Sequence, residues 1–205
     1  MSLTPSPLEL RARALTDLRI GLPVIIRAPQ PLVVCAAETL TDERLASLRS
    51  LGEVQAVISK WRANTLKINL YDGDIARLSV PVRANAEWCQ AVADPIRDLS
   101  YPMKGPFQSI RGGEVGAERA AIELLKSAQL LPMAITVKMN QEIGNLTELP
   151  TEIAINTELT HIVAAPLPLQ VAQAGKVHLY RPQGGGDEHY AIEIGAPDRT
   201  VPILT

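Results

Sequence analysis

The chain has 205 residues, which is long for one small domain and short for two full ones, so we expect one core domain with an appendage. Hydrophobic residues make up 46% of the chain and charged residues 20%, a balance that supports a buried core and excludes general disorder. The formal net charge is −2 and lysines and arginines form no dense run, so we expect no nucleic acid partner.

The cysteines and the N-terminal segment indicate a cytoplasmic protein. Cys35 and Cys89 each lie in an apolar stretch, which is typical of reduced core thiols rather than of a disulfide framework. The N-terminus is not a basic segment followed by an apolar run, and no stretch approaches membrane-spanning length. We therefore expect neither export nor membrane insertion. Trp61 and Trp88 are expected in the core.

The first half of the chain alternates helix and strand signals. Leu8, Leu15 and Leu18 indicate an amphipathic helix, and a later helix is expected to start at the cap Thr41 and to stop at Gly52. Two apolar runs joined by a short proline-containing connection predict a β-hairpin. The expected elements are a helix over 8–19, hairpin strands over 22–26 and 32–37, a helix over 41–51, strands over 54–58 and 66–70, and a helix over 85–92.

The second half begins with a long loop. Residues 99–113 are rich in proline, glycine and polar side chains, which predicts a surface loop before a helix over 115–128 and a buried strand over 131–137. Near the end, a glycine-rich turn between 177–180 and 190–194 predicts a hairpin. A further strand is expected over 201–204. Because the chain stops there, we expect it to be a fragment.

These signals predict three segments. We expect a domain over residues 1–145, a linker over 146–170 and a β-hairpin segment over 171–205. The pattern along the chain predicts an α/β protein, that is, a mixture of helices and strands.

Two glycine-rich turns could bind an anion. Gly184, Gly185 and Gly186 precede a strand rather than the helix that a phosphate-binding loop needs. Gly112 and Gly113 precede a helix and follow Arg111, so this turn is the better candidate. A plain loop-to-helix turn remains the favoured interpretation.

The histidine and aspartate residues are not spaced along the sequence as in known metal-binding motifs. His161, His178 and His189 show no close ligand spacing and are expected to be exposed or to lie in the hairpin. Asp72 and Asp74 flank a glycine, but the residues that follow do not continue a calcium loop. We therefore expect no metal, no cofactor and no catalytic residue in this chain.

Two stretches together resemble dihydroxybutanone phosphate synthase, the riboflavin-pathway enzyme that converts ribulose 5-phosphate to a four-carbon phosphate and formate. They are ALTDLRIGLPVII with LVVCAAE, at residues 14–26 and 32–38, and AAIELLKSAQLLP at residues 120–132. The resemblance covers residues from about 10 to 140. It implies an α+β fold, in which helices pack on the faces of a mixed sheet, and a homodimer.

The same resemblance implies a degenerate site. The family has an acidic, magnesium-binding loop where this chain has residues 27–31, which include no carboxylate. The family's Gly-His-Thr-Glu-Ala motif corresponds to residues 116–120, where Ala117 replaces the histidine and Arg119 the glutamate. Magnesium would thus lose hard oxygen ligands, and the reaction its electrophile.

The C-terminal segment resembles GTP cyclohydrolase II. Residues 185–198, GGDEHYAIEIGAPD, and the following VPIL are similar to the first hairpin and third strand of that family, whose zinc-binding cysteines come later in the sequence. A synthase-like domain followed by a cyclohydrolase is also the order in fused riboflavin-pathway proteins.

Three functions are compatible with these resemblances. The first is a non-catalytic N-terminal portion of a GTP cyclohydrolase II-type protein, with a structural, dimerising or regulatory role and a downstream cyclohydrolase domain as partner. The second is a divergent synthase whose metal and acid–base groups have moved to Asp72, Asp74 and Glu114. The third is a phosphorylated-ligand binder that uses Arg62, Arg111 and Arg119 as anion anchors, against the alternative that all of them are solvated surface charges.

Overall fold

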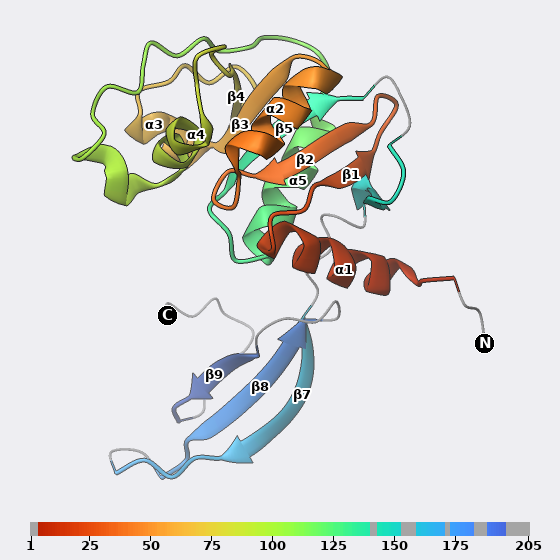
Figure 1. Cartoon of the computed structure of the whole chain (residues 1–205). Coiled ribbons are helices and arrows are strands. Elements are labelled where there is room, and N and C mark those ends of the chain that lie inside the picture. The colour runs from red at the N-terminus through yellow and green to blue at the C-terminus, as the bar shows by residue number, and fades with distance from the viewer. Residues whose placement is uncertain (1–3, 140–142, 153–158, 171–172, 183–187, 196–205) are drawn as a thin grey trace. The chain divides into compact units, whose positions relative to one another are not determined.

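The computed structural model describes residues 4–139, 143–152, 159–170, 173–182 and 188–195. The chain forms two compact units, Met1–Asn156 and Thr157–Thr205 (Figure 1). No helix among the described residues is long and apolar enough to cross a membrane.

The first unit is built on a six-stranded sheet with the order β4-β3-β5-β2-β1-β6. All neighbouring strands are antiparallel except β1 and β6, which are parallel. The strands are β1 (Val24–Arg27), β2 (Leu32–Ala36), β3 (Val54–Ser59), β4 (Ile75–Ser79), β5 (Met133–Lys138) and β6 (Thr147–Pro150). The helices are α1 (Pro7–Arg19), α2 (Asp42–Leu51), α3 (Lys60–Thr65), α4 (Ala86–Ala93) and α5 (Gly116–Ser127), with a 3₁₀ turn η1 (Pro95–Asp98).

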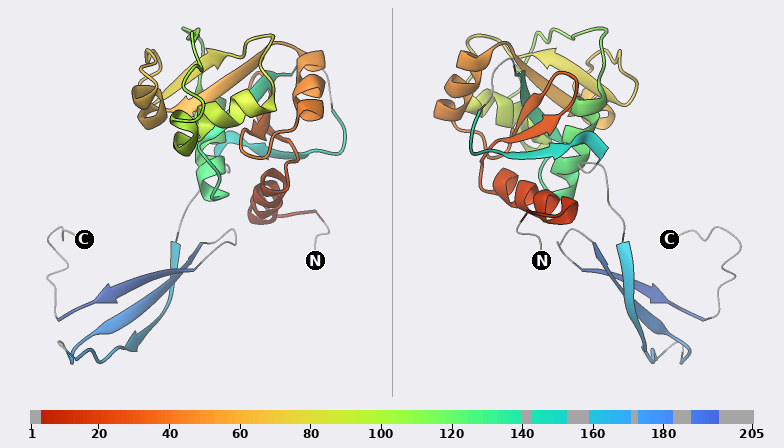
Figure 2. Two further views of the ribbon diagram at one scale, coloured as in Figure 1. Left: turned by 60° about the vertical axis from the view of Figure 1, so that its left-hand side comes forward. Right: turned by 90° about the vertical axis from the view of Figure 1, so that its right-hand side faces the viewer.

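Helices cover both faces of this sheet, as the two further views show (Figure 2). Successive side chains of a strand point to opposite faces, so β2 divides its residues between two cores. Val33 and Cys35 pack with α2 and α4, whereas Val34 and Ala36 pack with α1 and α5. Every residue of β2 is buried, which explains why this strand is an uninterrupted apolar run in the sequence.

The predicted α+β fold with a mixed sheet packed between helices is confirmed. The hairpin of β1 and β2, the helices α1, α2, α4 and α5 and the strands β3 and β5 lie close to the ranges expected for them. Thr41 caps α2 as predicted, since its hydroxyl accepts a hydrogen bond from the backbone N–H of Arg44 at 3.2 Å.

Two expectations for residues 60–70 are wrong. No strand forms over 66–70; the short helix α3 ends at Thr65, and Lys67 adopts a left-handed φ of 55° that is incompatible with a strand. Trp61 is not in the core, because α3 turns its side chain outward and leaves it 82% exposed, whereas Trp88 is buried as predicted.

The second unit contains a three-stranded antiparallel sheet of β7 (Leu159–Pro166), β8 (Lys176–Pro182) and β9 (His189–Glu193). The predicted C-terminal hairpin is the β8–β9 pair. The range 146–170, predicted as a linker, instead contains β6, which completes the first sheet, and β7, which pairs with β8. The glycines at 184–186 and the strand predicted over 201–204 lie outside the described residues.

Candidate functional site

A cavity of about 490 Å³ lies beside the first sheet. Its walls come from the β1–β2 turn, the start of α5 and the ends of β5 and β6. The residues that line it are Ala28, Pro29, Gln30, Leu32, Glu114, Gly116, Ala117, Glu118, Lys138 and Thr151. The fold thus brings parts of residues 27–31 and 116–120, the two stretches that correspond in position to the synthase motifs, to one cavity.

The charged lining of this cavity consists of Glu114, Glu118 and Lys138. Glu118 is in the first turn of α5 and is only 2% exposed. Its Oε1 is buried and receives no hydrogen bond from the described part of the chain. The residue before the helix, Val115, provides no side-chain cap, so the first N–H groups of α5 also lack that usual acceptor.

The two stretches at the cavity lack the magnesium-binding groups that the synthase resemblance implies at these positions. Magnesium needs near-octahedral oxygen coordination. Within the described ranges, no group of three or more His, Cys, Asp or Glu side chains could hold a metal ion. Ala117 offers no ligand where the family has an imidazole, and the β1–β2 turn offers no carboxylate.

The structure does not bring together Asp72, Asp74 and Glu114, the residues considered above for a divergent synthase site. Asp72 is bound by Arg77 through two contacts of 2.8 and 3.1 Å, and Asp74 is paired with Arg119 at 2.8 Å. Glu114 lines the cavity, whereas neither aspartate does. These aspartates therefore bind arginines of their own chain.

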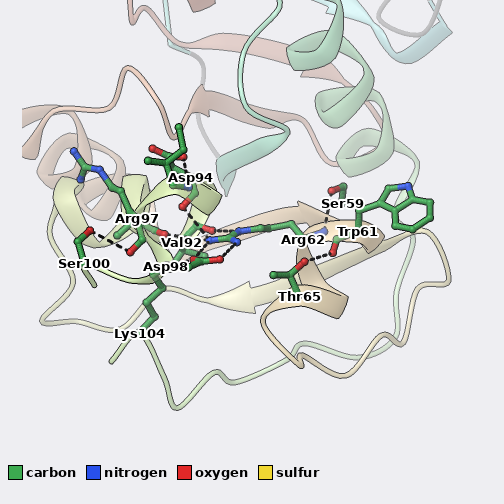
Figure 3. A network of polar contacts seen from close by, with 12 residues as sticks. Ser59, Trp61, Arg62, Thr65, Val92, Asp94, Arg97, Asp98, Ser100 and Lys104 are labelled. Carbon is green, nitrogen blue, oxygen red and sulfur yellow. Dashed lines mark hydrogen bonds and ion pairs between the residues drawn. The ribbon is translucent and has the colours of Figure 1, made fainter. Parts of the chain in front are cut away.

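Arg62, the first anion-binding candidate, is buried in an intramolecular network away from the cavity (Figure 3). Its guanidinium donates to both carboxylate oxygens of Asp98 at 2.7 Å and to the carbonyl oxygen of Val92 at 2.6 Å. Further bonds to the carbonyls of Ala91 and Asp94 complete a cap on the C-terminal end of α4.

The ammonium group of Lys104 is also paired with the Asp98 carboxylate. The backbone carbonyl oxygen of Lys104 accepts a hydrogen bond from the indole N–H of Trp88. Together Arg62 and Lys104 hold the pKa of the Asp98 carboxyl well below its ordinary value, with the Arg62 hydrogen bonds as the main cause. Arg62 therefore connects α3, α4 and η1, and its donors are engaged in these contacts.

The other two arginines are placed elsewhere. Arg111 lies over the ring of Tyr71, with 4.0 Å from its Cζ to the ring centroid, and donates to the Tyr71 hydroxyl at 2.5 Å. Arg119 donates to the Asp74 carboxylate and to the Asp72 carbonyl, each at 2.8 Å. None of the three arginines lines the 490 Å³ cavity. Anion binding by Arg62, Arg111 and Arg119 stays a prediction.

The second unit contains a polar cluster that spacing alone did not predict. His178 Nδ1 lies 3.3 Å from His161 Nε2, and His178 Nε2 lies 3.1 Å from a Glu193 carboxylate oxygen. The strand register also places Tyr180 beside His161 and opposite His189, so all three histidines are on one face of the sheet. His161 joins this cluster through the pairing of β7 with β8, whereas Glu193 and His189 join it through the pairing of β8 with β9. A linker was predicted where β7 lies.

The chain is similar in fold to solved structures of 3,4-dihydroxy-2-butanone 4-phosphate synthases. RibBX, a two-domain enzyme of this name from A. baumannii, matches with a TM-score of 0.51 and 15% identity over 90% of this chain and 70% of that chain. A cation-free synthase matches with a TM-score of 0.51 and 18% identity over 70% of this chain and 93% of that chain. The chain therefore contains a domain with the fold of dihydroxybutanone phosphate synthases.

At the level of sequence, the chain is similar to GTP cyclohydrolase-2 from Azospirillum brasilense, with 28% identity over 177 residues. The match covers 79% of this chain but 46% of that protein, so the chain spans under half the length of this curated relative. No family model matches the chain. The resemblance to riboflavin-biosynthesis proteins, first indicated by the motifs, is thus confirmed by sequence and by fold.

Proposed function

We propose that the first unit is a non-catalytic, synthase-like domain of a GTP cyclohydrolase II-type riboflavin-biosynthesis protein, with a structural, dimerising or regulatory role. The observation that supports this is the composition of the cavity. Parts of residues 27–31 and 116–120 line it, yet they supply neither a magnesium-binding carboxylate from the turn nor an imidazole at Ala117. A downstream cyclohydrolase domain, a cytoplasmic location and the lack of a cofactor in this chain belong to the same proposal.

The test is release of formate from ribulose 5-phosphate in the presence of magnesium. We expect none from the purified chain under conditions in which a competent dihydroxybutanone phosphate synthase gives a clear signal. Formate release by the chain would contradict the proposal and favour the divergent synthase. In that event Glu118→Gln, which alters the cavity, and Glu123→Gln, on the outer side of the same helix, would show whether the activity arises in the cavity.

We further propose that the chain forms a homodimer. The exposed apolar residues Ile96, Leu99 and Met103 support this, because each is more than 85% exposed and they lie close together in sequence at η1 and the following loop. Light scattering should give a dimer for the wild-type chain and a monomer for Leu99→Asp. Ile20→Asp, which changes an exposed apolar residue at the end of α1, is the control and should remain a dimer.

A dimer that survives both Leu99→Asp and Ile96→Asp would show that these residues are not in the interface. A wild-type chain that stays monomeric at high concentration would contradict dimerisation itself.

A further inference from the structure

A second cavity in the first unit, of about 200 Å³, is lined by residues of α3, α5 and the start of β4. Arg119, Glu123 and Lys126 are three or four residues apart on α5, so they lie on one side of that helix and together form one wall. Among the described residues, this cavity shares no lining residue with the 490 Å³ cavity. The two cavities are therefore separate candidate sites.

Trp61 lines the smaller cavity and is 82% exposed. The fold uses the backbone of this residue, since its carbonyl oxygen accepts a hydrogen bond from Thr65 Oγ1 at 3.1 Å. The indole itself packs against no other described aromatic ring. An indole has a broad apolar face on which another ring can stack. Because so much of Trp61 is exposed, a ligand in the cavity can reach this face.

The charged side chains around this cavity include one more cation than anions. Arg119 pairs with Asp74 at 2.8 Å, and Lys126 pairs with Glu123 at 2.7 Å. Lys60, the first residue of α3, is exposed and forms no ion pair with a described residue. Both existing pairs are about half-exposed, and such pairs contribute little, so an incoming anion can compete for their cations. The wall therefore favours an anion over a cation.

From these observations we propose that the smaller cavity binds an aromatic anion, whose ring stacks on Trp61 and whose phosphate or carboxylate group contacts Lys60. Neighbouring positions of α3 thus supply the two kinds of contact, a stacking face and a charge-assisted hydrogen bond. The cavity is smaller than those that enclose drug-sized molecules, which suits a ligand with a single ring. Arg119, an anion-binding candidate from the sequence, would serve this cavity.

The experiment follows the indole N–H signals of the isotope-labelled full chain by NMR during titration with phenyl phosphate. The chain has two tryptophans. Trp61 is exposed, whereas Trp88 is buried and its indole N–H donates to a backbone carbonyl, so its signal is an internal control. Trp61→Phe assigns the two signals. We expect phenyl phosphate to shift the Trp61 signal in a saturable manner and to leave the Trp88 signal in place.

Two further probes separate the contributions of ring and charge. Cyclohexyl phosphate keeps the anionic group without an aromatic ring, and benzylamine keeps the ring with the opposite charge. We expect each to bind at least about fivefold more weakly than phenyl phosphate. Equal binding of benzylamine, or a Trp61 signal that phenyl phosphate does not shift, would overturn the proposal.

Variants test the two residues directly. Lys60→Gln should weaken phenyl phosphate binding about fivefold, whereas the control Lys67→Gln, an exposed lysine that does not line this cavity, should leave it unchanged. Trp61→Ala should abolish binding, measured on the phosphorus signal of the probe. Unchanged binding to Lys60→Gln or to Trp61→Ala would contradict the site.

Light scattering of Trp61→Ala completes the test. We expect the mass of the wild-type chain, and a lower mass would assign Trp61 to a protein interface instead of a ligand site. The proposal does not depend on the loss of synthase activity, because the residues that correspond to the synthase motifs line the other cavity. Formate release would leave it standing.

Discussion

A buried arginine and an exposed arginine in this chain contribute differently to the free energy of unfolding, although both are charged. Arg62 is 6% exposed and donates to Asp98 and to three backbone carbonyls, whereas Arg111 is exposed and lies over Tyr71. Removing Arg62 leaves three backbone carbonyls without this donor in a place that water reaches poorly, and it leaves Asp98 with Lys104 as its remaining partner. When an exposed cation such as Arg111 is removed, water hydrates the groups that it contacted.

We therefore expect Arg62→Ala to lower the free energy of unfolding by about 3 kcal/mol or more. Arg111→Ala should lower it by about 1 kcal/mol or less, since the cation–π contact is solvent-exposed. Urea denaturation of the two variants and the wild-type chain measures both values. Equal losses would contradict the structural role of the Arg62 network.

The same network predicts an acid-dependent stability. Because Arg62 and Lys104 lower the pKa of Asp98 in the folded state, the unfolded chain takes up a proton on this carboxyl at a higher pH than the folded chain does. The stabilisation is therefore complete above the ordinary aspartate pKa, about 3.9, and is lost as the pH falls below it.

The measurement is the difference in unfolding free energy between the wild-type chain and Asp98→Asn as a function of pH. We expect a constant difference at neutral pH and a smaller one as the pH falls below about 4. A difference independent of pH over this range would show that Asp98 does not carry a lowered pKa.

At the scale of elements, the sequence was informative wherever local signals and burial agree. The caps and glycine stops predicted α1 and α2, and the apolar runs predicted β1, β2, β3 and β5. Residues 66–70 alternate apolar and polar like a strand, but Ile68 is buried from a connection after α3 rather than from the sheet. Alternation of apolar and polar residues over five positions does not distinguish a strand from a connection with one buried side chain.

The location of the candidate site was predictable from the sequence, but the surroundings of its polar side chains were not. The resemblance located residues 27–31 and 116–120, which do meet at one cavity. It did not indicate that Glu118 is buried without a donor at Oε1, because that depends on how α5 packs in the folded chain. Likewise, the engagement of Arg62 with Asp98 depends on a turn of the chain that no local pattern specifies.

Strand β6 is the element that most changes the expected domain boundary. It pairs in parallel with β1, fully buries Leu149 and places Thr147 Oγ1 2.6 Å from an Asp17 carboxylate oxygen on α1. Residues beyond 145 thus complete the first core. We expect Leu149→Ala to cost about 3 kcal/mol of stability.

The matched control is Glu148→Ala in the same strand. Its carboxylate pairs with the exposed Arg27 at the surface, so this change should cost about 1 kcal/mol or less. Thermal and urea unfolding of both variants gives the comparison. A Leu149→Ala variant as stable as Glu148→Ala would show that β6 contributes little to the first unit.

For the whole molecule, the two units differ in what stabilises their sheets. The first sheet is covered on both faces by helices, whereas no residue of β7, β8 or β9 is buried. Val163, Leu179 and Ile192 share the face of the second sheet opposite the histidines, and this face is exposed or only partly covered. A small sheet with so little buried apolar area has a low local stability.

Hydrogen exchange monitored by NMR should therefore separate the two sheets. We expect the amides of β2 and β5 to exchange only with global unfolding, and those of β8 to exchange much faster although β8 is paired on both sides. Equal protection of β8 and β5 would contradict this difference. If the protection of β8 increases with protein concentration, association buries the apolar face, because a property of the single chain would not depend on concentration.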